Sequence, residues 1–298
     1  MPARHSIPAY VVCAGVVCAL AVPATADWDP GDGHKMHWPQ LPDFNGWDVA
    51  ATTTGEAPNK VYRHVADDWQ CKETGPVDDI HFWGSWKNGV KGTIDHFMVS
   101  VWADDPAGPG GYFDDNPFST PLYRDEDGTI GDIWYWGVYP GEFTERLYGQ
   151  GQQGWYDPNT GQAIQDDHTE IYQYNISCPN AFVQEKGTIY WLEIAAVTTG
   201  GEWGWKTSGS EQFMDDATYY DSLTTVPDGY PHAGWDMPDW QELYGPMNPE
   251  NSLDMAFVIT PEPSAMGLLA LGGLALMHHR RKSDTASHAL FEKEKGVQ

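Results

Sequence analysis

The stretch Glu170-Ile171-Tyr172-Gln173-Tyr174-Asn175-Ile176-Ser177-Cys178 decides the fold class. Apolar side chains occupy every second position from Tyr172 to Cys178, and polar side chains fill the positions between them. Side chains of a β-strand point alternately to its two faces, whereas a helix repeats its apolar positions every three or four residues. The pattern therefore predicts a strand that buries one face.

Other segments predict further strands. Leu253–Ile259 alternates in the same way, and Thr188–Val197 is apolar on both faces apart from Glu193, which indicates a central strand. The remaining candidates are Asp79–Trp86, Thr93–Ala103 and Ile133–Tyr139. Turn-rich stretches such as Pro106–Gly111 and Tyr148–Gly154 separate them, with no amphipathic helix in between. This arrangement predicts an all-β, antiparallel β-sandwich of the jelly-roll type.

The composition indicates a folded and strongly acidic protein. The chain has 298 residues, and its 15 Trp, 15 Tyr and 10 Phe supply enough apolar surface for a core. The formal net charge of -27 repels nucleic-acid phosphates and anionic lipids, so both are excluded as partners of the folded domain. Calcium ions and neutral sugars remain compatible with such a surface.

The N-terminal residues 1–26 have the features of a secretory signal peptide. Arg4 precedes an apolar run over Ile7–Val22, and Ala24-Thr25-Ala26 supplies the small residues that signal peptidase requires. A retained membrane anchor is the alternative, but the run is short and ends at Pro23 and the small-residue site. We expect cleavage after Ala26 and export of the chain.

The C-terminal residues 261–282 contain three features in a fixed order. Pro261-Glu262-Pro263 is followed by the apolar run Ala265–Met277 and then by the basic cluster His278-His279-Arg280-Arg281-Lys282. This order resembles the PEP-CTERM sorting signal. The resemblance implies that exosortase is a partner, that the apolar helix inserts transiently in the inner membrane, and that the protein reaches the cell surface or extracellular matrix.

Physical arguments agree with a processed signal. The basic cluster would stay on the cytoplasmic side, and the apolar run is shorter than the roughly 20 residues of a stable membrane span. A simple C-terminal membrane anchor remains the alternative. The charged tail over residues 283–298 departs from the PEP-CTERM pattern, whose members usually end soon after the basic cluster.

The chain between these signals divides into a turn-rich segment over residues 27–62 and a β-sandwich domain over residues 63–260. Two elements of the domain, Ala66-Asp67-Asp68-Trp69-Gln70-Cys71 and Asp79-Ile80-His81-Phe82-Trp83-Gly84-Ser85, resemble an uncharacterised domain of secreted proteins from planctomycete-type bacteria. That resemblance implies a compact extracellular domain and carries no activity with it.

Two cysteines lie in the predicted domain. Because the chain is exported, Cys71 and Cys178 are predicted to form a disulfide, with two buried thiols as the alternative. Their spacing and neighbours do not suggest a zinc site.

Two further patterns suggest ligands. Asp125, Asp127 and Asp132 flank a glycine, which makes a weak calcium loop without the bidentate Glu of an EF-hand; a plain acidic turn is the alternative. Four tryptophans are candidates for stacking on sugar rings: Trp134, Trp136, Trp203 and Trp205. The alternative is that these indoles fill the core, and we expect Trp235 and Trp240 in the Pro-rich stretch to be exposed.

Catalytic motifs are absent from the sequence. It has no H-E-x-x-H helix and no G-x-S-x-G elbow, and the glycine-rich stretch Gly149–Gly154 is not followed by a helix pattern, which predicts a loop. His81 and His96 are interpreted as hydrogen-bonded structural residues. The sequence thus predicts a non-catalytic structural or adhesive surface protein. Alternatives are a calcium-assisted carbohydrate-binding module and a glycan-active hydrolase or lyase.

Overall fold

The computed structural model describes residues 27–54, 61–109, 117–122, 132–221 and 240–260, and nearly all of its regular structure is β-strand. One sheet has the order β11 (Trp203–Lys206), β1 (Trp47–Ala50), β8 (Phe143–Asp157), β9 (Gln162–Gln184), β4 (Gly75–Trp86) and β16 (Phe257–Thr260). The second has the order β13 (Trp240–Glu242), β12 (Thr218–Asp221), β3 (Arg63–Gln70), β10 (Ile189–Thr199), β5 (Thr93–Asp105) and β6 (Thr120–Pro121). Strand β2 (Thr52–Thr53) pairs with β10, and β7 (Asp132–Val138) pairs with β5.

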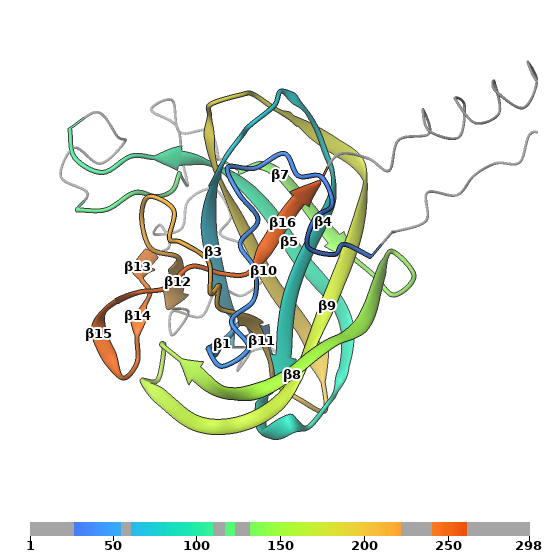
Figure 1. The fold of residues 1–298 in the computed structure, drawn as a ribbon, viewed down its shortest axis with the longest axis vertical. Helices are drawn as coiled ribbons and strands as arrows, with labels where there is room; N and C mark the ends of the chain where they lie inside the picture. Colours follow the sequence, from blue (N-terminus) through green and yellow to red (C-terminus); the bar gives the residue numbers. More distant parts are fainter. Residues whose placement is uncertain (1–26, 55–60, 110–116, 123–131, 222–239, 261–298) are drawn as a thin grey trace, which may run out of the picture.

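These strands form the predicted antiparallel β-sandwich (Figure 1). The first sheet curls until it nearly closes, because β11 pairs with β1 on one side and with β4 on the other. Two pairings are parallel, β1 with β8 and β2 with β10. A short hairpin, β14 (Tyr244–Gly245) with β15 (Asn248–Ser252), and the 3-10 turn η1 (Lys87–Gly89) complete the described elements.

The core between the sheets is built around aromatic rings. Phe82, Phe97, Tyr174 and Trp203 contact one another with ring centroids 5.1–6.0 Å apart. Strand β10 lies between β3 and β5 and is buried over most of its length, which confirms the predicted central strand. The fold therefore uses its large aromatic content mainly as interior.

Strand β9 has the predicted alternation, but its polar face is not exposed. Gln173 and Asn175 are fully buried because the segment that begins at Asp27 lies across them. The amide Nδ2 of Asn175 donates to Asp27 Oδ1 at 3.0 Å, and Nε2 of Gln173 donates to the carbonyl of Trp28 at 2.7 Å. The turn-rich N-terminal segment is thus an integral layer of the domain.

The glycine-rich stretch Gly149–Gly154 is not the predicted loop, because it lies inside β8. The reason is that two aromatic residues cross this part of the strand. A Cβ on Gly151 would lie 1.9 Å from the carbonyl oxygen of Phe44, and a Cβ on Gly154 would lie 2.4 Å from the ring of Trp47. Glycine is needed here for close approach rather than for turning.

The predicted disulfide is not formed, since Cys71 and Cys178 are both buried thiols. Cys71 follows β3 in the second sheet and Cys178 lies on β9 in the first, and each packs as a small apolar side chain in the common core. Burial raises the pKa of the Cys71 thiol to about 12. The structure therefore contains two buried thiols, which was the alternative to the predicted disulfide.

Candidate functional site

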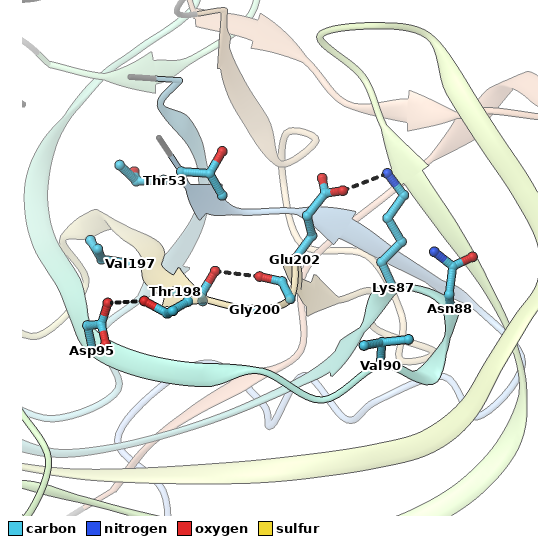
Figure 2. Close-up of a pocket in the computed structure, with 12 residues that line it drawn as sticks. Thr53, Lys87, Asn88, Val90, Asp95, Val197, Thr198, Gly200 and Glu202 are labelled. Carbon is cyan, nitrogen blue, oxygen red and sulfur yellow. Dashed lines mark hydrogen bonds and ion pairs between the residues drawn. The ribbon is translucent and has the colours of Figure 1, made fainter. Parts of the chain in front are cut away.

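A pocket with a volume of about 800 Å³ lies between η1, β5 and the turn that follows β10 (Figure 2). Its walls are Lys87 and Asn88 of η1, Asp95 of β5, and the turn from Thr198 to Glu202 between β10 and β11. Two glycines allow the connections to approach. A Cβ on Gly92 would lie 2.7 Å from the backbone nitrogen of Gly201, so neither connection has room for a larger residue there.

The polar groups of this pocket are already engaged with one another. Lys87 Nζ donates to Glu202 Oε1 at 2.9 Å, and the hydroxyl of Thr199 donates to Asp95 Oδ2 at 2.9 Å, as Figure 2 shows. The hydroxyl of Thr198 donates to the Gly201 carbonyl at 2.6 Å. Hydroxyl, amide and paired charged groups of this kind suit hydrogen bonding to a neutral, polyhydroxylated ligand.

A smaller pocket of about 230 Å³ is lined by Lys91, His168, Glu170 and Tyr172. Lys91 forms an ion pair with Glu145 and lies over the Tyr172 ring at 4.1 Å. The Tyr172 hydroxyl donates to Glu170 Oε2 at 2.5 Å, and burial together with this carboxylate raises the pKa of Tyr172. Tyr172 therefore remains a protonated donor at neutral pH and is not poised to act as a base.

His168 belongs to a buried charge network that no sequence motif indicates. Its Nε2 lies 2.8 Å from Asp48 Oδ2 and its Nδ1 lies 2.9 Å from Asp167 Oδ2, while Lys206 Nζ donates to Asp48 Oδ2 at 3.0 Å. Burial is the largest single influence and opposes the charged ring, but the hydrogen bonds to Asp48 and Asp167 and the charge of Asp48 together outweigh it, so the pKa of His168 is raised. With both ring nitrogens hydrogen-bonded to aspartates, His168 has a structural role.

Aspartates gather at the edge of β3, beside the start of β12. Asp67 accepts hydrogen bonds from the Gln40 amide at 3.0 Å and from the Met255 backbone at 2.6 Å. Burial and the nearby acids raise the pKa of Asp67 and Asp68 well above the usual range, and burial raises that of Asp254 to about 6. In the sequence, the Asp67-Asp68 pair is an ambiguous acidic signal that was not selected as a site, and no pattern marks Asp254.

The tryptophans proposed to contact sugars do not form an exposed row. Trp203 and Trp205 are fully buried in the core, so both are corrected to structural residues. Trp134 and Trp136 are half-buried, lie 5.9 Å apart and pack against the core from β7. Trp240 is also buried, contrary to the expectation that it is exposed, because it packs in a second small cluster with Trp102 and Trp191. Trp235 lies outside the described residues.

Several predicted site residues lie outside the described part of the chain. These are the cleavage residues Ala24 and Ala26, the sorting residues Pro261, Glu262, Pro263, Arg280 and Arg281, and the calcium-loop residues Asp125 and Asp127. Asp132 begins β7. Within the described ranges, no three His, Cys, Asp or Glu side chains are arranged to hold a metal ion, and no helix is both long and apolar enough to cross a membrane.

The interpretation of His81 as a structural residue is confirmed. Its Nδ1 is hydrogen-bonded to Asn175 Oδ1 at 2.7 Å and its Nε2 to Thr260 Oγ1 at 3.1 Å. His96, the other candidate, stacks on the ring of Tyr139. Neither histidine lines one of the two pockets described above.

His37 supplies a prediction about pH. Burial lowers its pKa to about 3, and its Nδ1 accepts a hydrogen bond from the Gln70 backbone, which protonation would remove. As the pH falls, His37 takes up a proton at about pH 6.5 in the unfolded chain but only near pH 3 in the folded protein. The folded protein therefore loses stability as the pH falls below about 6.5. We expect this residue to cost roughly 1–3 kcal/mol of unfolding free energy between pH 7 and pH 4.

Urea unfolding of the wild type and of His37→Gln at both pH values measures this cost. The glutamine keeps an acceptor but does not titrate, so the difference between the two proteins should widen towards acid pH in favour of the variant. His34→Gln is the matched control, since the pKa of His34 is lowered less strongly, mainly by its partial burial. A difference for His37→Gln that is independent of pH would contradict the prediction.

Comparison with known proteins gives a family but no activity. Neither the curated proteins nor the solved structures contain a match to this chain. The sequence model of one family, described as a domain of unknown function, matches residues 36–260, which cover both sheets and both pockets. The chain belongs to the DUF7901 family of domains of unknown function.

Proposed function

We propose that this is an exported, exosortase-sorted protein of the cell surface or extracellular matrix, whose β-sandwich is non-catalytic and adhesive and holds neutral polysaccharide in the 800 Å³ pocket. The observation that carries the proposal is the state of the pocket's polar groups. Asp95 and Glu202 already accept hydrogen bonds from Thr199 and Lys87, so neither carboxylate is free for acid–base work.

The positions of the two predicted signals support the same role. Asp27, the first residue after the predicted cleavage site, is linked through Asn175 and His81 to Thr260, the residue before the predicted sorting signal. Thr260 pairs with Asp79 near the start of β4, whereas the pocket begins at Lys87, just after β4 ends. Eight residues of strand separate these positions by roughly 26 Å. Both signals would therefore leave one end of the domain while the pocket opens at the other.

The glycan-active enzyme is less well supported than the adhesive role. A glycosidase needs a carboxylic acid and a carboxylate that are available on the two sides of the scissile bond. In the pocket, the Glu202 carboxylate is held by Lys87 and lies 3.8 Å from Arg63. Both cations hold this carboxylate in place, so it is not free to approach a glycosidic bond.

Binding of the purified chain to immobilised neutral and anionic polysaccharides tests the proposal. We expect saturable binding to a neutral polysaccharide. The affinity should weaken about tenfold in Asn88→Gly and in Thr199→Val, because each change removes a side-chain group that can form hydrogen bonds with the ligand. Asn88 has φ 56°, so glycine preserves the backbone there.

Thr188→Val is the matched control, because Thr188 is exposed just before β10 begins, at the end of that strand remote from the pocket. It should bind like the wild type. The proposal fails if the wild type binds none of the polysaccharides, or if both pocket variants retain the full affinity.

A further inference from the structure

A second feature of the domain lies around β3, partly on the face of the eight-stranded sheet remote from the main core and partly at the edge of the strand. Val65 and Trp69 of β3 belong to that core, so Ala66 and Asp68 point to the other face. Thr218 of β12 pairs with Ala66 and shares this face. Asp254 lies at the edge of β3 just beyond Thr218, the first residue of β12, and the following residue, Met255, donates its backbone N–H to Asp67. These positions form a buried polar region beside β3.

Five buried side-chain oxygens of this region have no hydrogen-bond partner among the described residues. They are Asp68 Oδ1 and Oδ2, Asp254 Oδ1, Gln40 Oε1 and Thr218 Oγ1. The Asp68, Gln40 and Thr218 side chains are fully buried, and Asp254 is 2 % exposed. The amide nitrogen of Gln40 donates to both Asp67 and Asp254, which places its oxygen beside the same group of acids. A buried carboxylate with neither oxygen satisfied is costly unless a ligand completes it.

The charges around Asp68 act in one direction only. Asp254, Asp104 and Asp215 all repel a negative charge on Asp68. Asp48, the buried carboxylate of the other sheet, has Lys206 and His168 beside it. The same fold thus places basic side chains beside the buried Asp48 carboxylate, whereas the charged groups that act on Asp68 are acidic.

We propose that this region is a binding site for a hard divalent cation of the calcium type, with ligands from Asp68, Asp254, Gln40 and Thr218. Carboxylate, amide and hydroxyl oxygens are the ligands that calcium takes, and water completes its six to eight positions. The set holds two carboxylates, from Asp68 and Asp254, and each has at least one oxygen without a hydrogen-bond partner among the described residues. It is separate from the acidic loop at Asp125–Asp132 and from the polysaccharide pocket.

The neighbouring tryptophans provide a direct test. Trp191 lies opposite Asp68 in the β3–β10 pairing, and its indole N–H donates to Asp104 Oδ1 at 2.8 Å. Terbium(III) binds calcium sites and emits when a nearby indole is excited. We expect the purified, metal-free chain to show saturable terbium emission on tryptophan excitation, which calcium displaces more effectively than magnesium because calcium accepts irregular oxygen cages.

Variants separate this site from other acidic surface. Asp68→Asn and, as a second variant, Asp254→Asn should each weaken terbium and calcium binding at least tenfold. Asp95→Asn, in the polysaccharide pocket, should leave both unchanged. Calcium should also raise the Tm of the wild type, and Asp68→Asn should abolish this rise while raising the Tm in EDTA, because it removes repulsion among the acids.

Two outcomes would overturn the site. One is the lack of a terbium signal that calcium displaces. The other is unchanged affinity in whichever of the Asp68→Asn and Asp254→Asn variants remains folded by circular dichroism. The assay does not involve polysaccharide, so its failure would leave the proposed adhesive function standing.

Discussion

Replacing Trp203 by alanine is expected to lower the free energy of unfolding by about 3–5 kcal/mol, the usual cost of removing a large aromatic side chain from a core. Trp203 is fully buried and its ring contacts Phe97 at 5.3 Å and Tyr174 at 5.7 Å. Its indole also fills the space above Gly84, where a Cβ would lie 2.3 Å from Trp203. The cavity left by alanine opens at the centre of the sandwich, and urea unfolding followed by tryptophan fluorescence measures the loss.

The control for this prediction is Trp136→Ala. Trp136 has the same side chain but is half-buried on β7, at the margin of the core. Folding removes less of the Trp136 side chain from water. The loss in free energy of unfolding should therefore be less than half of that for Trp203→Ala. Equal losses for the two variants would mean that the aromatic cluster around Trp203 does not organise the core.

Replacing Lys206 by methionine is expected to cost about 3–5 kcal/mol as well, but for an electrostatic reason. Lys206 is fully buried and donates to Asp48, which is also fully buried. Methionine fills a similar volume without the charge, which leaves Asp48 with His168 as its remaining cationic partner. Removing one partner of a buried ion pair leaves the other charge buried without compensation, which is strongly destabilising.

Two further variants test the electrostatic cause. Asp48→Asn combined with Lys206→Met should recover part of the loss, since neither charge is then stranded. Lys87→Met removes a lysine whose partner, Glu202, is one-third exposed (34 %), and it should cost less than about 1 kcal/mol. A loss for Lys206→Met as small as that for Lys87→Met, or a double variant no more stable than Lys206→Met, would contradict this account.

The strands could be predicted because their signals are local. Tyr172, Tyr174 and Ile176 alternate with polar residues, and this period depends only on backbone geometry. Glu193 interrupts an apolar strand without disrupting it, because it lies on the outer face of β10 and accepts a hydrogen bond from the indole of Trp102. A polar residue in a central strand was therefore compatible with the correct assignment.

The errors arose where a residue type serves two purposes. Gly151 and Gly154 read as turn residues, yet they lie in a strand because Phe44 and Trp47 cross it. Trp205 was a candidate sugar contact in the sequence and Trp240 was expected to be exposed, yet both are interior residues in the structure. Indole suits both a sugar face and a protein core, so composition cannot distinguish the two roles.

The sequence by itself determined the all-β class, the central strand and the structural role of His81, since each follows from short-range periodicity or from residue type. Only the tertiary structure decided which groups meet in a site. Gln40 and Asp254 are 214 residues apart and share a hydrogen bond, and Asp48 lies 158 residues from Lys206. Such contacts depend on which distant strands pair and on how the segments around the sheets pack, and no local pattern in the sequence records either.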